Sequence, residues 1–227
     1  MAQETNSSAF SPAWRDRIQK CGFVATIILE DPEAAVPLAN ALCDGGVDCI
    51  ELTLRTEGAL EAMRRMSSEV PRALVGAGTV LTPQQVNACV EAGAKFGVAP
   101  GTNPRVIQEA QSAGWSFAPG VCTPSDVERA LELGCTLLKF FPCEPCGGLP
   151  YLRSMAAPFA HLGVQFIPLG GIDEHNAAGY LGEPLVPAIG GSWLAPQNLI
   201  HQRDWEAITA RARAIRELID RTRGGNS

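Results

Sequence analysis

Eight short apolar runs, separated by helical patterns, constrain the fold of this chain more than any other feature. The runs cover residues 23–29, 49–54, 73–76, 95–99, 116–118, 136–141, 164–169 and 186–189. Strands that alternate with helices are typical of a parallel sheet, because a crossover between parallel strands needs a connection of helix length. Eight such units in 227 residues fit a (β/α)8 barrel, which usually needs about 200–250 residues. We therefore expect an α/β fold, a (β/α)8 TIM barrel that forms a single domain over residues 1–227.

The helices between these runs have clear start signals. Asp31, Thr82, Asn103 and Thr123 each precede a proline, so that an N-cap residue stands before a proline at the first helical position. Gln85 lies three residues after Thr82 and completes a capping box with it. These signals predict helices on the outside of the barrel.

The two ends of the chain frame the barrel pattern. We expect a short N-terminal helix over residues 13–20, a long final helix over residues 204–223, and disorder in residues 1–12 and 224–227. The polar start lacks the apolar core of a signal peptide, and the sequence has no apolar run of membrane-spanning length. We expect a soluble, cytoplasmic protein without membrane contact.

Charge and cysteine content narrow the class of protein. The net charge of −6 and the lack of a Lys/Arg cluster argue against a nucleic-acid partner. The cysteines are scattered, and without a secretory signal they are expected to be reduced. Cys143 and Cys146 form the one close pair; a redox or metal role is conceivable, but two free thiols in a loop is the favoured interpretation, because no second pair has zinc-site spacing. We expect neither a metal nor a cofactor.

A lysine interrupts the sixth apolar run. Lys139 stands between Leu138 and Phe140, and lysine is almost never fully buried unless another group pairs with it. Burial disfavours the charged form of a lysine, and a neutral amine attacks carbonyl carbons. The run therefore contains either a catalytic lysine or a structural ion pair.

The second apolar run is interrupted in a similar way. Strand side chains alternate between faces, so Glu51, Thr53 and Arg55 share one face. The alternative interpretation is an edge strand whose polar side faces solvent. A closed barrel has no edge, so we expect the polar side chains to point inward, where Glu51 can meet Lys139.

Two glycine pairs follow the last two runs. Gly170 and Gly171 follow the seventh run, and Gly190, Gly191 and Ser192 follow the eighth. Paired glycines let backbone N–H groups approach an anion closely. Barrels commonly bind phosphate in the loops after strands 7 and 8, so these positions predict a phosphate site.

The third and fourth runs end in further loops of the same face. Thr79 follows the third run and Pro100 follows the fourth. Each is typical of an ordinary turn when taken alone. Because barrel enzymes place their chemistry on this face, we expect both residues to contact the substrate.

Five segments taken together resemble a known family. They are residues 50–56, 75–80, 139–142, 170–172 and 189–194, and they resemble the 2-keto-3-deoxy-6-phosphogluconate (KDPG) aldolase family, which also includes 4-hydroxy-2-oxoglutarate aldolases. The likeness runs in order from about residue 18 to about residue 215. It implies a class I, Schiff-base aldolase on a (β/α)8 barrel, without a metal and usually a homotrimer, acting in the Entner-Doudoroff pathway of carbohydrate metabolism.

The resemblance also implies roles for single residues. Lys139 matches the Schiff-base lysine and Glu51 the general acid/base. Arg55 and Thr79 match the groups that hold the pyruvate carboxylate, and Phe141 matches the aromatic residue that packs on the pyruvyl portion. The phosphate site is matched by Gly170, Gly171, Gly190, Gly191 and Ser192. The implied ligands are a 2-keto-3-deoxy sugar-acid phosphate, cleaved to pyruvate and D-glyceraldehyde 3-phosphate, and pyruvate itself.

The sequence departs from the family pattern at one position near the sugar chain. The family commonly has a threonine before the Gly-Gly-Ile segment, and here that position is Leu169. The galactonate epimer or 4-hydroxy-2-oxoglutarate is therefore an alternative substrate, although the Ser192 loop favours a phosphorylated one. Two other functions stay open: a sugar-phosphate isomerase or synthase in which Lys139 acts only as an electrostatic stabiliser, and a non-catalytic sugar-phosphate sensor.

Overall fold

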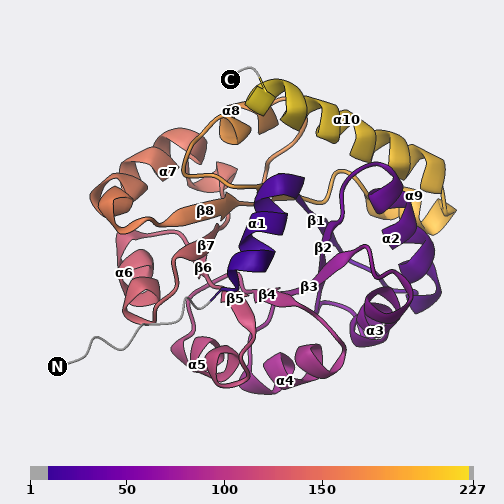
Figure 1. Ribbon diagram of the computed structural model, residues 1–227, viewed down its shortest axis with the longest axis horizontal. Helices are drawn as coiled ribbons and strands as arrows, with labels where there is room; N and C mark the ends of the chain where they lie inside the picture. Colours follow the sequence, from indigo (N-terminus) through magenta and orange to yellow (C-terminus); the bar gives the residue numbers. More distant parts are fainter. Residues whose placement is uncertain (1–9, 225–227) are drawn as a thin grey trace.

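The computed structural model describes residues 10–224, and in it parallel strands curl into a ring with helices outside (Figure 1). Hydrogen-bonded strands follow the order β5-β4-β3-β2-β1-β9 in one ladder and β6-β7-β8 in the other, and every pair is parallel. The strands are β1 (Phe23–Ile27), β2 (Cys49–Thr53), β3 (Leu74–Gly78), β4 (Phe96–Val98), β5 (Ser116–Ala118), β6 (Gly120–Val121), β7 (Leu137–Phe140), β8 (Gln165–Pro168) and β9 (Ile189–Gly191). The expected barrel is confirmed.

Pro119 divides the fifth barrel strand into β5 and β6. Proline has no N–H to donate to a ladder, but its carbonyl oxygen accepts a hydrogen bond from the N–H of Lys139 at 2.9 Å. β5 pairs with β4 and β6 pairs with β7. β8 in turn contacts β9, so the two ladders form one ring.

The last strand begins later than the sequence predicted. We expected a strand over residues 186–189, but β9 begins at Ile189 and includes both glycines. The N–H of Val186 is used in a turn, where it donates to the carbonyl of Glu183. Gly190 and Gly191 pair with β1. Because glycines have no side chains, they give no strand pattern in the sequence from which this pairing could be predicted.

Helices surround the ring in Figure 1. The α-helices are α1 (Pro12–Cys21), α2 (Ala35–Asp44), α3 (Ala59–Glu69), α4 (Pro83–Glu91), α5 (Pro104–Ser112), α6 (Pro124–Glu132), α7 (Gly148–Ala156), α8 (Ala177–Leu181), α9 (Gln197–Gln202) and α10 (Trp205–Gly224), and the 3-10 helices are η1 (Pro32–Ala34), η2 (Glu144–Cys146) and η3 (Ala157–Leu162). The predicted N-terminal and final helices correspond to α1 and α10. No helix in residues 10–224 is long and apolar enough to cross a membrane.

The predicted helix caps are present. Thr82 and Gln85 form the capping box expected from their spacing, and the side chains of Asn103 and Thr123 accept backbone hydrogen bonds at the start of α5 and α6. Asp31 caps the 3-10 helix η1 instead of an α-helix. Each cap satisfies a backbone N–H that the helix itself leaves without a partner.

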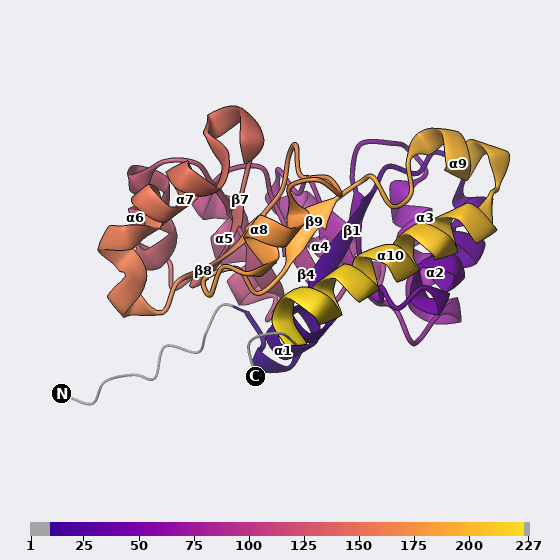
Figure 2. The same ribbon diagram turned by 90° about the horizontal axis from the view of Figure 1, so that it is seen from above.

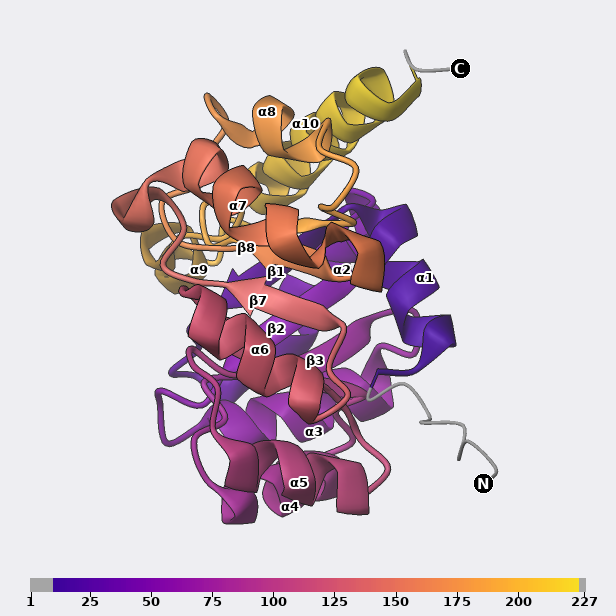
Figure 3. The ribbon, with the colours of Figure 1, turned by 90° about the vertical axis from the view of Figure 1, so that its left-hand side faces the viewer.

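The helix α1 closes the end of the barrel where the strands begin, as Figures 2 and 3 show. Ile18 of α1 is fully buried, and the ring of Phe10 lies 6.2 Å from that of Phe96. Phe10 is buried and α1 begins at Pro12. Residues 1–9 and 225–227, which make up most of the two ends for which we expect disorder, lie outside the described part. With this end closed, a ligand can enter only from the other one.

A close contact between α2 and α10 gives a test of this packing. A methyl group on Gly45 would lie 2.3 Å from the Cβ of Ala212 and 2.7 Å from the carbonyl oxygen of Thr209. Gly45 has φ −84°, a backbone that alanine adopts freely. Gly45→Ala should therefore lower the free energy of unfolding through crowding alone, by about 1–3 kcal/mol, measured by urea denaturation.

Gly101→Ala is the matched control for this experiment. No described atom lies within 4 Å of a methyl group placed there, so the free energy of unfolding should stay the same or rise by up to about 1 kcal/mol. Equal stability of Gly45→Ala and the unmodified chain would contradict the close packing of α10 on α2.

Candidate active site

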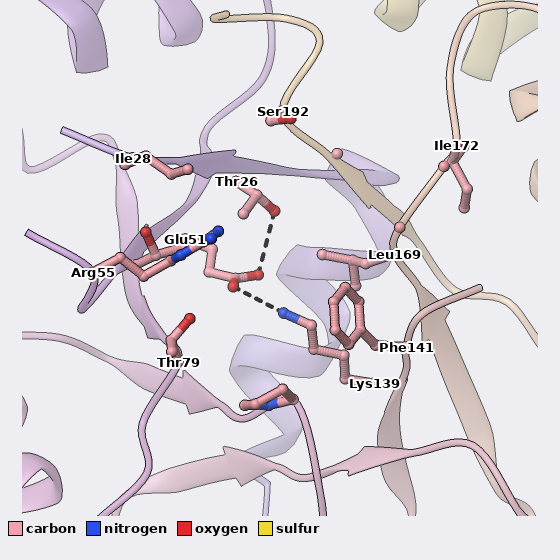
Figure 4. A pocket seen from close by; sticks show the side chains of 15 residues that line it. Thr26, Ile28, Glu51, Arg55, Thr79, Lys139, Phe141, Leu169, Ile172 and Ser192 are labelled. Carbon is pink, nitrogen blue, oxygen red and sulfur yellow. Dashed lines mark hydrogen bonds and ion pairs between the residues drawn. The ribbon is translucent and has the colours of Figure 1, made fainter. Parts of the chain in front are cut away.

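A cavity of about 210 Å³ opens at the carboxyl ends of the strands (Figure 4). Its walls come from strand ends and from the loops that follow them. The lining residues are Thr26, Ile28, Glu51, Thr53, Arg55, Thr79, Pro100, Lys139, Phe141, Leu169, Gly170, Gly171, Ile172, Gly191 and Ser192. This is the face on which barrel enzymes carry their chemistry.

A buried ion pair lies at the base of the cavity. The Nζ atom of Lys139 is 3.0 Å from Oε1 of Glu51, and the two side chains are only 8% and 2% exposed. The hydroxyl of Thr26 donates to the other carboxylate oxygen at 3.4 Å. Lys139 and Glu51 lie 88 positions apart in the sequence, and they meet as expected from strand alternation.

Strand β7 directs Lys139 into the barrel. Leu138 and Phe140 are fully buried, and the Phe140 ring stacks on Tyr151 of α7 at 6.1 Å. Lys139 and Phe141 face the other way and both line the cavity. The centroid of the Phe141 ring lies 5.5 Å from Nζ of Lys139, within the range of a cation–π contact.

Gly78 makes room for the carboxylate. A methyl group on this residue would lie 2.1 Å from Oε1 of Glu51. Gly78 pairs with Thr53 in the neighbouring strand, so β3 passes close to the acid. A side chain at this position would push Glu51 away from Lys139.

Arg55 and Thr79 form one side of the cavity (Figure 4). Arg55 follows β2 on the inward face, is exposed, and makes no ion pair within residues 10–224. Thr79 has φ 60°, which is rare for a β-branched residue and marks strain that often occurs at functional sites. This side therefore offers a guanidinium group and a hydroxyl to an anion.

The glycine loops form the opposite side. Gly170 and Gly171 have φ 96° and 85°, conformations that other residues rarely adopt. Gly191 and Ser192 complete this side. Gly190, which we also expected here, lies in β9 behind Leu169: a methyl group on it would be 2.6 Å from the Leu169 side chain.

The sequence predicted no role for several of the lining residues. Thr26 lies within an apolar run, and its hydroxyl was the only feature in the sequence that could have indicated a place in the site. Thr53 shares the inward face of Glu51 but donates its hydroxyl to the carbonyl of Ile27 at 3.1 Å. The remaining ones, Ile28 and Ile172, are apolar and carry no chemical signal.

The cysteines Cys143 and Cys146 do not pair with each other. Cys143 is buried and donates to the hydroxyl of Tyr180 at 3.1 Å, and burial raises the pKa of Cys143 to about 12. Cys146 instead faces Cys122, with 3.0 Å between the two sulfur atoms. All three are free thiols.

A possible metal-ligand group lies at the other end of the barrel. Within residues 10–224, one group of three potential ligands brings its donor atoms within 4.8 Å of one another, namely Cys21, Asp48 and Cys49. Asp48 already forms an ion pair with Arg17 at 2.9 Å. These residues precede or begin the first two strands, so they lie far from the cavity.

The arrangement of the cavity limits its chemistry. The amine of Lys139 can attack a carbonyl group, and the adjacent carboxylate of Glu51 can take up or return protons. An anionic group fits beside Arg55, and a second one fits among the backbone N–H groups of the glycine loops. The site therefore suits an oxo acid that carries a negative group at each end.

A comparison with protein-family models gives one match. The model described as KDPG and KHG aldolase matches residues 15–211. The KHG/KDPG aldolase of Escherichia coli (strain K12) is 43% identical over 190 residues, which cover 84% of this chain and 88% of the relative.

Solved structures agree with this match. The KDPG aldolase of Zymomonas mobilis ZM4, solved with 3-phosphoglycerate, has a TM-score of 0.82 and 40% identity over 88% of this chain and 93% of its own. The enzyme of Legionella pneumophila, solved with pyruvate captured at low pH as a covalent carbinolamine intermediate, has a TM-score of 0.84 and 35% identity over 88% and 97%.

The stability of the ion pair is open to a direct test. Lys139→Met leaves the carboxylate of Glu51 buried without its cation, which should lower the free energy of unfolding by about 3–5 kcal/mol. The double variant Lys139→Met/Glu51→Leu should recover most of that loss, because no charge is then left buried. Urea denaturation at neutral pH measures both.

The exposed pair of Arg64 and Glu61, whose side chains are 50% and 56% exposed, gives the control. Glu61→Gln should change the free energy of unfolding by less than about 1 kcal/mol. A Lys139→Met variant as stable as the unmodified chain would show that the two charges are not buried together.

Proposed function

Because the chain belongs to the KDPG and KHG aldolase family, we propose that it cleaves KDPG to pyruvate and D-glyceraldehyde 3-phosphate through a Schiff base on Lys139. One observation carries the proposal: the buried amine of Lys139 lies 3.0 Å from a carboxylate oxygen of Glu51, between two sites for anions. This contact supports the proposal, because a covalent mechanism requires a nucleophile and an acid/base at one reacting centre.

The covalent step begins at Nζ of Lys139. Glu51 takes a proton from the ammonium group, and the free amine attacks the C2 ketone of the substrate. The resulting carbinolamine loses water to give an iminium ion, with Glu51 returning the proton that the leaving hydroxyl needs. The carbinolamine with pyruvate in the Legionella pneumophila structure is the same type of intermediate in a related protein.

Carbon–carbon cleavage follows from the iminium ion. Glu51, acting through a water molecule, removes the proton of the C4 hydroxyl, and the C3–C4 bond electrons move into the iminium group. Glyceraldehyde 3-phosphate leaves, the enamine is protonated at C3, and water releases pyruvate from Lys139. The hydroxyl of Thr26, 3.4 Å from the second oxygen of Glu51, holds the carboxylate in place during these transfers.

The two sides of the cavity orient the substrate. Arg55 suits the C1 carboxylate, because a guanidinium group can bind both oxygens, and Thr79 adds a hydroxyl beside it. Phe141 packs on the pyruvyl portion. The phosphate is held on the opposite side by Gly170, Gly171, Gly191 and Ser192. The 3-phosphoglycerate in the Zymomonas mobilis structure carries the same kinds of anionic group.

Leu169 favours a second substrate. Leu169 lines the cavity, directly precedes Gly170 and is 5% exposed. An isobutyl group cannot hydrogen-bond a sugar hydroxyl, so the site has one hydrogen bond fewer with which to distinguish the two C4 epimers. We therefore propose that the galactonate epimer is cleaved as well. The homotrimer and the cytoplasmic location stay predictions.

Borohydride trapping tests the proposed reaction. Treatment with pyruvate and sodium borohydride should leave a pyruvyl adduct on Lys139, because reduction fixes the iminium bond, and peptide mapping by mass spectrometry locates it. Lys95, which is exposed, is the internal control and should stay unmodified. Lys139→Ala should give neither adduct nor cleavage.

Each alternative function gives a different result in this experiment. If pyruvate binds without leaving an adduct, the Schiff base is wrong. Turnover of a sugar phosphate without an adduct would then favour the isomerase or synthase, and binding without turnover would favour the sensor.

Leu169→Thr tests substrate selection. A hydroxyl at this position should raise the ratio of kcat/KM for the gluconate substrate over its galactonate epimer by about 2- to 10-fold, the worth of one hydrogen bond. Leu169→Val is the matched control, because valine has the shape of threonine without its hydroxyl. Equal ratios in the two variants would rule out selection by a hydrogen bond at this position.

A further inference from the structure

Two thiols are in contact in the loops that follow β6 and β7. The sulfur atoms of Cys122 and Cys146 are 3.0 Å apart, although the residues are 24 positions apart in the sequence. Both side chains are partly exposed, so a small solute can reach them. The catalytic mechanism uses neither thiol.

The backbone of Cys122 is held on both sides. Its N–H donates to the carboxylate of Asp126 at 3.1 Å, and its carbonyl oxygen accepts from the hydroxyl of Tyr151 at 2.8 Å. Cys122 directly follows β6, whose Val121 pairs with Phe140 of β7. Its position is therefore fixed relative to the lysine strand.

Cys146 is the last residue of the 3-10 helix η2, in the connection between β7 and α7, residues 141–147, which we call the Cys146 loop. This loop is hydrogen-bonded to the phosphate side of the cavity. In this loop the N–H of Cys143 donates to the carbonyl of Leu169 at 2.8 Å, and the N–H of Glu144 donates to the carbonyl of Gly170 at 2.9 Å. Leu169 and Gly170 line the cavity. A movement of the Cys146 loop therefore reaches the phosphate-binding glycines.

The order of the strands gives the direction of that movement. β7 lies between β6 and β8, so Cys122 is on one side of the Cys146 loop and Gly170 is on the other. A disulfide requires a sulfur–sulfur distance of about 2.05 Å, which is shorter than the present one. Drawing Cys146 toward Cys122 therefore pulls its loop away from Gly170.

We propose that Cys122 and Cys146 are a redox modification site, joined into a reversible disulfide by a peroxide, and that this bond weakens binding at the phosphate side. The effect on activity rests on the proposed aldolase function, whereas the disulfide itself does not. The glycine loop loosens, while the Lys139–Glu51 pair on β7 and β2 stays in place.

The chemistry balances with hydrogen peroxide as oxidant. The Cys146 thiol gives up its proton, and the thiolate attacks one peroxide oxygen. The O–O bond breaks and the leaving hydroxide takes up that proton, so that a sulfenic acid and one water form. The sulfur of Cys122 then attacks the sulfur of Cys146, the S–O bond breaks, and the leaving hydroxide takes the proton of the Cys122 thiol and departs as a second water. Two thiols and one peroxide thus give one disulfide and two waters.

The order of attack follows from the surroundings of Cys122. Burial, followed by the hydrogen bond with Cys146, raises the pKa of Cys122 to about 11. The Cys122 thiol is also the donor in its hydrogen bond with the sulfur of Cys146. Because the thiolate is the reactive form, we assign the first attack to Cys146 and the resolving role to Cys122.

Peptide mapping and kinetics on the full chain test the proposal. After treatment of the reduced protein with hydrogen peroxide, digestion without reductant should give the Cys122 and Cys146 peptides linked. The KM for KDPG should rise by about 2- to 10-fold, as expected for one weakened hydrogen bond, with a smaller change in kcat. Dithiothreitol should reverse both changes.

Single cysteine variants provide the controls. Cys122→Ser and Cys146→Ser should each prevent the link and the KM change. Cys43→Ser should keep the link and the KM change, because Cys43 lies on α2, away from the pair. It is a matched control, since Cys43 is also partly exposed and burial raises its pKa to about 11.

The outcomes separate this proposal from the proposed function. Absence of the link, or a link of Cys146 to Cys143, would overturn the disulfide. A link with an unchanged KM would overturn its effect on phosphate binding. A reduced protein that does not cleave KDPG would overturn the aldolase function instead, and the peptide map would still decide whether the disulfide forms.

Discussion

The buried contact between Lys139 and Glu51 is the interaction on which the rest of the site depends. Two charges taken out of water lose hydration, and their mutual attraction offsets that loss only when they are close and further hydrogen bonds are made. The structure meets both conditions: the 3.0 Å contact needs Gly78 beside it, and Thr26 donates to the second carboxylate oxygen. The ion pair therefore depends on one residue from each of four strands: Thr26 on β1, Glu51 on β2, Gly78 on β3 and Lys139 on β7.

The barrel confines this polarity to one end. Toward the start of the strands the interior is apolar, with Phe10 and Ile18 closing it against Val24, Phe96 and Ile167. Toward the carboxyl ends, the inward positions become Glu51, Thr53 and Lys139. On β1 the change occurs between Val24 and Thr26, two residues apart, because only every second side chain points inward. A small shift in register would therefore bury the charges in the apolar end or turn them toward the helices.

Local patterns made much of this predictable, and long-range contacts explain what was missed. The caps at Thr82 and Thr123 depend on residues three positions away, and strand alternation was enough to bring Lys139 toward Glu51. The start of β9 was misplaced because Gly190 has no side chain and its pairing partner, Val24, lies more than 160 positions earlier. The contact of Cys146 with Cys122 depends in the same way on the register of β6 and β7, which no local pattern reveals.

The two sides of the cavity are built with different rigidity, and this decides where related proteins can differ. The amine and its carboxylate lie on strands in the middle of hydrogen-bonded ladders, where reacting groups are held most accurately. The opposite side consists mainly of loops, with Gly191 at the end of β9, and these loops are bound to each other, since the loop after β7 donates to Leu169 and Gly170. Loops tolerate substitution better than strands. Leu169, which departs from the family pattern, and the proposed disulfide site both lie on that side, so the proposed substrate choice and redox sensitivity can change there while the Lys139–Glu51 pair is preserved.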